Sequence, residues 1–344
     1  MQKDDCVTSD TLAPIKTTIS KGNEIHQDIS ELYANVGNVY EDLGAYEEAR
    51  DCYNKALKID TKLHGKIAHA DRARDFKNLG NAHKSLGEYK LALDYHKKSL
   101  IIRKEIYGKR TNHPDIANSY TNVGIAYRRI GKYVSALENF CKALTMWKDL
   151  GDDKENVAKA YNNIGNAYRG LEDYNLSLYY QIRSLEMKKD VYGAETNHPV
   201  IATCYENLGE TFYCLAKYDS ALKNFKHLLK MRKAVYGEDS RHPHIAIAYN
   251  GLAKTYHRLG DNTEALENCE RSSEILRTID DADTKHSVII AARYKIIGDV
   301  HYSLGKPLTA YEYHEMAFKL RKVIYKESRN HPEMVESCND MAKY

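Results

Sequence analysis

The feature that most constrains this sequence is a hairpin of two amphipathic segments that recurs about every 44 residues. One copy, at residues 118–150, has two apolar-periodic runs on either side of the break Gly131-Lys132-Tyr133, a pattern that predicts a helix-turn-helix unit. A hairpin of this size cannot bury its apolar face alone, so stacked copies must share a continuous core. The sequence therefore predicts an array rather than the two globular domains that 344 residues would otherwise suggest.

Two positions in each copy of the hairpin usually hold glycine or another small residue. The first, numbered eight in every repeat, follows a Tyr-x-x-hydrophobic signature, and successive copies are 43, 44, 41, 44, 44 and 45 residues apart. A glycine there lets two helices approach closely, whereas a glycine seven residues later suits the left-handed backbone that ends a helix. Position eight is occupied by Gly37, Gly80, Gly124, Gly165, Gly209, Ala253 and Gly298. The second position is occupied by Gly44, Gly87, Gly131, Glu172, Ala216, Gly260 and Gly305.

Composition narrows the class of protein. The chain is 42% apolar and 29% charged with a net charge of +3, which is ordinary for a soluble protein. It has no stretch of about 20 apolar residues that would span a membrane and no secretory signal. Its seven cysteines are odd in number and never form a Cys-x-x-Cys pair, so we expect free thiols in a reducing compartment. These features favour a cytoplasmic protein without membrane insertion.

The repeat also matches a known pattern. Each glycine at position eight follows an aromatic residue by four positions and precedes a small residue by twelve, as Tyr120 and Ala136 do around Gly124. This pattern resembles the tetratricopeptide repeat. The long period and connectors such as Tyr107-Gly108 followed by His113-Pro114 are most similar to the subclass found in kinesin light chains and nephrocystin-type proteins.

The resemblance implies an all-α fold, a right-handed superhelical solenoid whose concave inner wall is lined by the first helix of each hairpin. We expect a loosely ordered leader at residues 1–28, seven repeats at 29–330, and the first helix of an incomplete eighth repeat at 331–344. The chain is then either a segment of a longer protein or an array that its unfinished helix closes. Ala253, Asn262 and Pro307 depart from the pattern and put the local geometry of repeats six and seven in question.

The inner wall is the candidate binding surface. If positions four, seven, eight and eleven pack between helices, positions two, five, nine, twelve and thirteen share another face. Seven cations fall on that face in repeats two to four, with acidic residues in repeats one and five at both ends. Such a strip favours an acidic ligand, although a charge run is also typical of a solvated face. The cations are Arg74, Lys77, Lys84, Arg128, Arg129, Lys159 and Arg169.

Asparagine at position six is the second feature of the predicted site. It recurs in repeats one to five, although asparagine is a poor residue for a helix interior. Two interpretations stay open: an amide ladder that bonds an extended peptide backbone, and hydrogen bonds between the first helices of adjacent repeats. The amides assigned to the peptide site are two from position six, Asn122 and Asn163, and three from positions five and nine, Asn81, Asn162 and Asn166.

Catalytic signatures are missing from the sequence. There is no nucleophile elbow, phosphate loop or dinucleotide fingerprint. His242 and His244 would need further converging ligands to hold zinc, and the His-Pro pairs recur in the connectors as the starts of helices would. We therefore expect no enzyme, cofactor or metal, and consider nucleic acid an unlikely ligand. The predicted function is a scaffold or adaptor for an acidic peptide or tail. The alternatives are a sensor segment of a larger signalling protein, such as a nucleotide-binding-domain receptor, or a kinesin-light-chain-like cargo adaptor. The partner's identity and the oligomeric state are left open.

Overall fold

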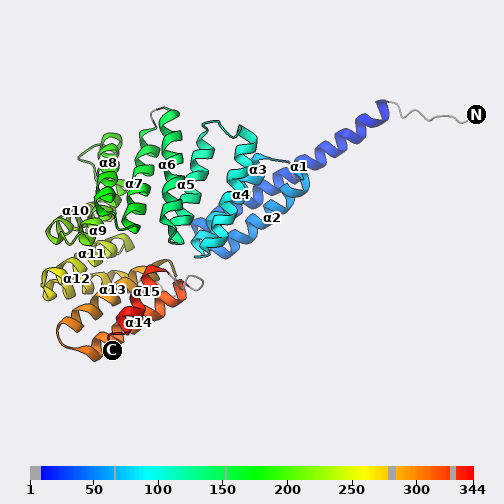
Figure 1. Ribbon diagram of the computed structural model, residues 1–344. Coiled ribbons are helices and arrows are strands. Elements are labelled where there is room, and N and C mark those ends of the chain that lie inside the picture. Colours follow the sequence, from blue (N-terminus) through cyan, green and yellow to red (C-terminus); the bar gives the residue numbers. More distant parts are fainter. Residues whose placement is uncertain (1–8, 66, 152, 278–283, 326–330) are drawn as a thin grey trace, which may run out of the picture. The chain divides into compact units, whose positions relative to one another are not determined.

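The computed structural model describes residues 9–65, 67–151, 153–277, 284–325 and 331–344, with side chains from His26 onward except at 284–286. Within these ranges all regular secondary structure is α-helical (Figure 1), which confirms the predicted all-α class. The helices are α1 (Ser9–Asp42), α2 (Tyr46–His64), α3 (Ala70–Ser85), α4 (Tyr89–Tyr107), α5 (Pro114–Arg129), α6 (Tyr133–Asp149), α7 (Lys154–Gly170), α8 (Tyr174–Tyr192), α9 (Pro199–Cys214), α10 (Tyr218–Tyr236), α11 (Pro243–Leu259), α12 (Asn262–Leu276), α13 (Thr284–Ser303), α14 (Pro307–Ile324) and α15 (Pro332–Met341).

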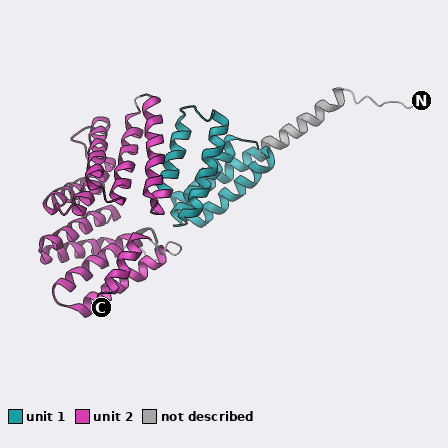
Figure 2. Ribbon diagram, viewed as in Figure 1, with its two compact units in different colours: residues 1–126 teal, residues 127–344 magenta. Residues whose placement is uncertain are grey.

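The chain forms two compact units, residues 1–126 and 127–344 (Figure 2). In the first unit α1 pairs with α2 and α3 with α4, while α2 also packs on α3. In the second unit α7 pairs with α8, and the same pairing joins α9 with α10, α11 with α12 and α13 with α14. The first helices α7, α9, α11 and α13 also contact one another in turn. Each hairpin therefore packs on its neighbours, as expected for a solenoid.

Position eight is where the two helices of a hairpin meet. In repeat five, a Cβ atom added to Gly209 would lie 2.8 Å from the Phe225 ring, so only glycine fits there. Repeat six has Ala253 instead, and the residue sixteen positions later is Cys269 rather than an aromatic. Ala253 and Cys269 are both buried in one cluster. The smaller partner makes room for the extra methyl group, so the departure at Ala253 leaves the hairpin intact.

The second position adopts the predicted left-handed backbone even where it is not glycine. Glu172 has φ of 62° and Ala216 has φ of 56°, in the region that glycine occupies in the other repeats. In repeat seven Pro307 is in the first turn of α14, where its missing N–H costs no hydrogen bond. The departures of individual residues from the pattern therefore do not interrupt the array.

The leader expected at residues 1–28 overlaps the first helix, α1. Residues 1–8 lie outside the described part of the chain, but from Ser9 the backbone is helical and continues without a break into the first repeat as α1. Residues 15–29 contain the apolar residues Ile15, Ile19, Ile25 and Ile29, which suit a helix that the first repeat can extend. The division between leader and first repeat at residue 28 stays a prediction.

A stacked tyrosine and histidine form a clasp in the connectors between repeats. The rings of Tyr107 and His113 lie 3.5 Å apart between centroids, and His113 Nδ1 accepts the backbone N–H of Asp115 at 3.1 Å. The histidine thus caps the helix that follows it. The same stacking and cap recur for Tyr192 with His198, Tyr236 with His242 and Tyr325 with His331. The His-Pro pairs are therefore helix starts, as predicted.

Candidate functional site

Inner positions of consecutive first helices touch one another in the second unit. Asn207 on α9 donates its amide N–H to Asn162 Oδ1 on α7 at 2.8 Å. One repeat further, Lys254 on α11 donates to both carboxylate oxygens of Glu210 on α9 at 2.6 Å. These contacts link residues about 44 positions apart, so the first helices of repeats four to six present one continuous polar surface.

The asparagines divide between the two interpretations left open by the sequence. Asn207, at position six, and Asn162 bond each other across adjacent repeats, and Asn166 Oδ1 accepts from Gln181 Nε2 at 3.4 Å. Asn81, Asn122 and Asn163 are half-buried and make no side-chain hydrogen bond with another described residue. The inter-repeat bond is therefore present at Asn207, while the other three amides retain free donors and acceptors.

The acidic residues of repeat five are balanced by cations of the same unit. Glu206 Oε2 lies 3.3 Å from the buried Arg232, and burial raises the pKa of Glu206 although Arg232 opposes that shift. Burial also acts to raise the pKa of Glu210, but Lys254 and Arg169 outweigh it and leave that pKa below its usual value. The acidic end of the predicted strip is thus a set of internal ion pairs.

Two predicted cations already have carboxylate partners. Arg74 lies 2.9 Å from Asp71 and 3.5 Å from the buried Asp60. Lys159 lies 2.5 Å from Glu155, one turn earlier on α7. Arg169 instead donates to the backbone carbonyl of Asn207 at 3.3 Å. Arg74 and Lys159 therefore have the least charge to offer a ligand.

Lys77 is in a different electrostatic setting. It is half-buried on α3 and forms no ion pair with a carboxylate of the described residues. Burial lowers the pKa of its ammonium group, and the nearby charge of Arg103 lowers it further. The carboxylates of Glu41 and Asp115 act to raise the pKa of Lys77, but they do not outweigh the loss of hydration on burial.

The remaining predicted residues are placed as follows. Lys84 and Arg128 are half-buried, and Arg129 is exposed at the end of α5. Burial, followed by the charges of Arg129 and Arg321, lowers the pKa of His331 to about 4. Because the twelve predicted residues are divided between the two units, their action as one groove stays a prediction.

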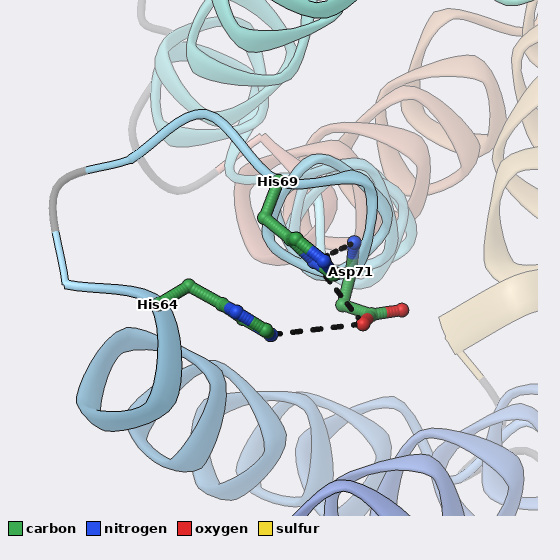
Figure 3. Close-up of side chains that lie close together, drawn as sticks. All are labelled: His64, His69 and Asp71. Carbon is green, nitrogen blue, oxygen red and sulfur yellow. Dashed lines mark hydrogen bonds and ion pairs between the residues drawn. The ribbon is translucent and has the colours of Figure 1, made fainter.

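One cluster has the composition of a metal site but the geometry of a clasp (Figure 3). His64, His69 and Asp71 bring their ligand atoms within 4.8 Å of one another. However, the two imidazole rings stack with centroids 3.5 Å apart, and His69 Nδ1 already accepts the N–H of Asp71. His64 occupies the position, at the end of the second helix, that tyrosine has in the other clasps. We therefore interpret the cluster as a helix cap.

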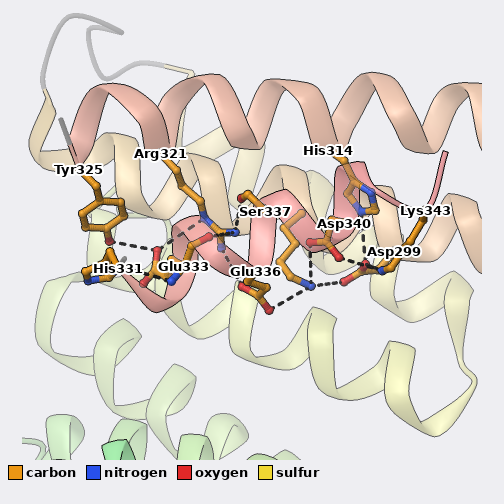
Figure 4. A network of polar contacts seen from close by, with 11 residues as sticks. Asp299, His314, Arg321, Tyr325, His331, Glu333, Glu336, Ser337, Asp340 and Lys343 are labelled. Carbon is orange, nitrogen blue, oxygen red and sulfur yellow. Dashed lines mark hydrogen bonds and ion pairs between the residues drawn. The ribbon is translucent and has the colours of Figure 1, made fainter. Parts of the chain in front are cut away.

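A polar network joins the last three helices (Figure 4). Lys295 Nζ lies 2.6 Å from Asp299 and 3.7 Å from Asp340, and the buried His314 lies 3.2 Å from the same Asp299. Asp299, His314 and Asp340 also have metal-ligating side chains, but the Lys295 ammonium already forms ion pairs with the two carboxylates. Sequence reasoning missed this network, although the i, i+4 spacing of Lys295 and Asp299 was a signal for its core.

Family comparison agrees with the repeat pattern. The tetratricopeptide repeat model matches residues 28–105, 75–149, 115–190 and 156–234, and a second tetratricopeptide repeat model matches 207–273. These matches cover more than half of the chain, which therefore belongs to the tetratricopeptide repeat family. Proteins with this fold generally act as scaffolds for protein–protein interaction. A comparison with curated proteins gave no significant match.

Solved structures share the fold at low sequence identity. Aspartyl phosphate phosphatase F from Bacillus subtilis superposes with a TM-score of 0.68 at 14% identity, covering 94% of this chain and 77% of its own. BtubC (BKLC) from P. vanneervenii has a TM-score of 0.55 at 20% identity, with coverage of 69% and 93%. A putative kinesin light chain with nearly identical TPR-like repeats from Podosopora anserina has a TM-score of 0.49 at 17% identity, with coverage of 60% and 94%. At these identities the matches concern the tetratricopeptide repeat fold alone.

Two further predictions from the sequence concern membrane-spanning helices and the state of the cysteines. No helix in the described ranges is long and apolar enough to cross a membrane. Six of the seven cysteines lie in the described part of the chain, and all six are free thiols. Cys6 lies outside it.

Proposed function

We propose that this protein is a scaffold or adaptor that binds an extended acidic segment of a partner protein along the inner positions of its first helices. The observation that carries the proposal is the setting of Lys77, a half-buried ammonium with a lowered pKa and no ion pair among the described carboxylates. A carboxylate of the ligand would supply the missing counter-charge, and a charge-assisted hydrogen bond of this kind is stronger than a neutral one.

The residues best suited to the ligand are fewer than the twelve that the sequence predicts. Arg74 and Lys159 already pair with carboxylates of the chain, so we assign them a minor role. Lys77, Arg128 and Arg129 are the cations that we assign to acidic side chains. Free amide groups can bond both the N–H and the C=O of a peptide backbone, and we assign this role to Asn81, Asn122 and Asn163.

The proposal is tested with a fluorescent peptide of about ten residues, which spans about 33 Å when extended. A glutamate-rich peptide should bind, and the same peptide with glutamine in place of glutamate should not. Binding should weaken as salt is raised, because exposed charges are screened over about 10 Å at 0.1 M. The triple variant Lys77→Glu, Arg128→Glu, Arg129→Glu should lower the affinity at least tenfold, about 1.4 kcal/mol.

The triple variant Lys58→Glu, Lys62→Glu, Lys90→Glu is the matched control. Lys58 and Lys62 are exposed on α2 and Lys90 on α4, both of them second helices, so these reversals change the net charge by the same amount without touching the inner positions and should leave the affinity within about twofold. Circular dichroism should show that every variant remains helical. If the two triple variants weaken the binding of the peptide equally, net charge alone attracts it and the proposed site is wrong. Equal binding of the glutamate and glutamine peptides would rule out acidic recognition.

A further inference from the structure

One residue of each second helix crosses the position-eight residue of its repeat and lies beneath the inner positions of the first helix. We call its place, sixteen residues after position eight, the crossing position. In repeat one it holds Tyr53, whose hydroxyl donates to Asn38 Oδ1 at 2.9 Å. In repeat four it holds Gln181, whose amide donates to Asn166 Oδ1 at 3.4 Å. Both acceptors are at position nine, so a polar side chain at the crossing position reaches the inner face of its own repeat.

His96 is at the crossing position of repeat two, where it has no such bond. It is 3% exposed, and its Nδ1 is buried without a hydrogen-bond partner among the described residues. A Cβ atom added to Gly80 would lie 2.5 Å from this nitrogen, so the ring crosses α3 as Tyr53 crosses α1. Asn81, at position nine, also makes no side-chain hydrogen bond with a described residue. The histidine and the position-nine amide of repeat two therefore both lack a partner.

Other crossing positions show what His96 lacks. Repeat seven has a histidine there as well, and Nε2 of this His314 lies 3.2 Å from the carboxylate of Asp299 at position nine. Repeats three and five have Phe140 and Phe225, both fully buried. A phenyl ring thus fits the crossing position without burying an unbonded nitrogen, which costs free energy. Packing alone therefore does not account for His96, and repeat two does not supply the carboxylate that the histidine of repeat seven has.

The surroundings of His96 favour an anion. Burial lowers the pKa of its imidazole to about 3, with further contributions from the charges of Lys84, Lys77 and Arg103. The ring is therefore neutral at pH 7 and carries one proton. Because Nδ1 has no acceptor, the tautomer that avoids an unbonded buried donor has this proton on Nε2. Lys77 and Lys84 are at positions five and twelve of the inner face, on either side of Asn81 at position nine.

We infer that His96 forms the floor of a carboxylate subsite in repeat two, where its Nε2–H donates to an acidic side chain of the ligand beside Lys77 and Asn81. The imidazole N–H, the amide N–H and the ammonium group are all donors, so one carboxylate can accept from each of them. The inference rests on the proposed function and adds to it a residue of a second helix. All three residues belong to the first unit.

Substitutions taken from the crossing positions of other repeats separate hydrogen bonding from packing. His96→Phe introduces the ring of repeats three and five, and His96→Gln introduces the N–H donor of repeat four. His96→Phe should lower the affinity for the fluorescent glutamate-rich peptide about tenfold, because one hydrogen bond to a charged group is lost. His96→Gln should lower it by no more than about threefold, because it keeps a donor.

Tyr95→Phe is the matched control. It removes a hydroxyl group from the adjacent, half-buried residue of α4 and should leave the affinity unchanged. Urea unfolding should show that His96→Phe is no less stable than the wild type, because the substitution removes an unbonded buried nitrogen.

Proton–carbon NMR of the histidine rings tests the contact directly. The ring signal that is absent from the spectrum of His96→Phe belongs to His96. Acetate, as the simplest carboxylate probe, should shift this signal in the wild-type chain, whereas sodium chloride at the same concentration should not.

The outcomes separate this inference from the proposed function. A wild-type chain that does not bind the glutamate-rich peptide would contradict the proposed function, and the acetate titration would still decide whether the subsite exists. A His96→Phe variant that binds the peptide like the wild type, or a His96 signal that acetate does not shift, would overturn the inference alone. Equal losses of affinity in His96→Phe and His96→Gln would mean that the shape of the ring matters rather than its N–H donor, and would also overturn it.

Discussion

At the residue scale, the boundary between repeats one and two differs from its counterparts. Two other boundaries bury an arginine against a serine, Arg103 with Ser119 at 2.8 Å and Arg321 with Ser337 at 2.7 Å. This boundary instead buries two carboxyl groups, Asp60 and Asp75, both fully inaccessible. Burial, followed by the hydrogen bond and charge of Asp60, raises the pKa of Asp75 to about 8, with Arg74 opposing. The native chain therefore retains a proton on Asp75 at pH values where the unfolded chain has lost it.

Because Asp75 retains this proton in the folded protein, we predict that the free energy of unfolding falls as the pH rises. A folded pKa above the unfolded value of 3.8 means that the contribution is fully present below about pH 4 and is lost as the pH approaches 8, with a steepest slope of about 1.4 kcal/mol per pH unit. Asp75→Asn cannot ionise, so it should remove this part of the slope and be the more stable protein at pH 8. Urea unfolding of both proteins from pH 4 to 8 measures the difference.

Asp94→Asn is the control, because Asp94 is exposed on α4 of the same unit. It should follow the wild-type pH dependence. Parallel curves for the wild type and Asp75→Asn would show that Asp75 is ionised in the folded protein, contrary to the prediction.

At the scale of the element, the two helices of a hairpin are matched in size where they cross. Gly209 faces Phe225, whereas Ala253 is accompanied by Cys269. Cys269→Phe alone should overfill repeat six and lower the free energy of unfolding by about 1–3 kcal/mol. Adding Ala253→Gly recreates the pairing of repeat five and should recover most of that loss. A double-mutant cycle by thermal or urea unfolding measures the coupling.

The single variant Ala253→Gly completes the double-mutant cycle and separates the effect of packing from that of helix propensity. Ala253→Gly alone should cost about 1 kcal/mol, since glycine is the poorer helix former and leaves a small void beside Cys269. Additive effects of the two substitutions would mean that positions 253 and 269 do not constrain each other, and the size-matching account of the hairpin would fail.

At the scale of the whole molecule, the sequence predicted those features of the fold that follow from the regular spacing of the repeat. Spacing was enough to predict the helical hairpins and the glycines whose left-handed backbone ends a helix, whereas Glu172, an exception to the pattern, adopts the same backbone without a signal from its residue type. It could not predict which side chains pair, because those distances depend on how neighbouring repeats pack. Thus Arg74 is bound to Asp71 and Asp60, and Glu210 to Lys254, although the pattern alone placed Arg74 in a free basic strip. For the same reason, the sequence could not decide whether the asparagines bond a peptide backbone or one another.

The two-unit organisation predicts that damage to one unit stays local, because each repeat of a solenoid depends mainly on its neighbours. Phe225 is fully buried in the core between repeats five and six, so Phe225→Ala should cost about 3–5 kcal/mol. Hydrogen exchange should show faster exchange in α9 to α11, while α1 to α4 keep wild-type protection. The exposed Tyr179→Ala on α8 serves as a control for loss of an aromatic ring and should change little. Equal loss of protection in α1 to α4 would mean that the chain unfolds as one cooperative body, and the nearest-neighbour description of this array would be wrong.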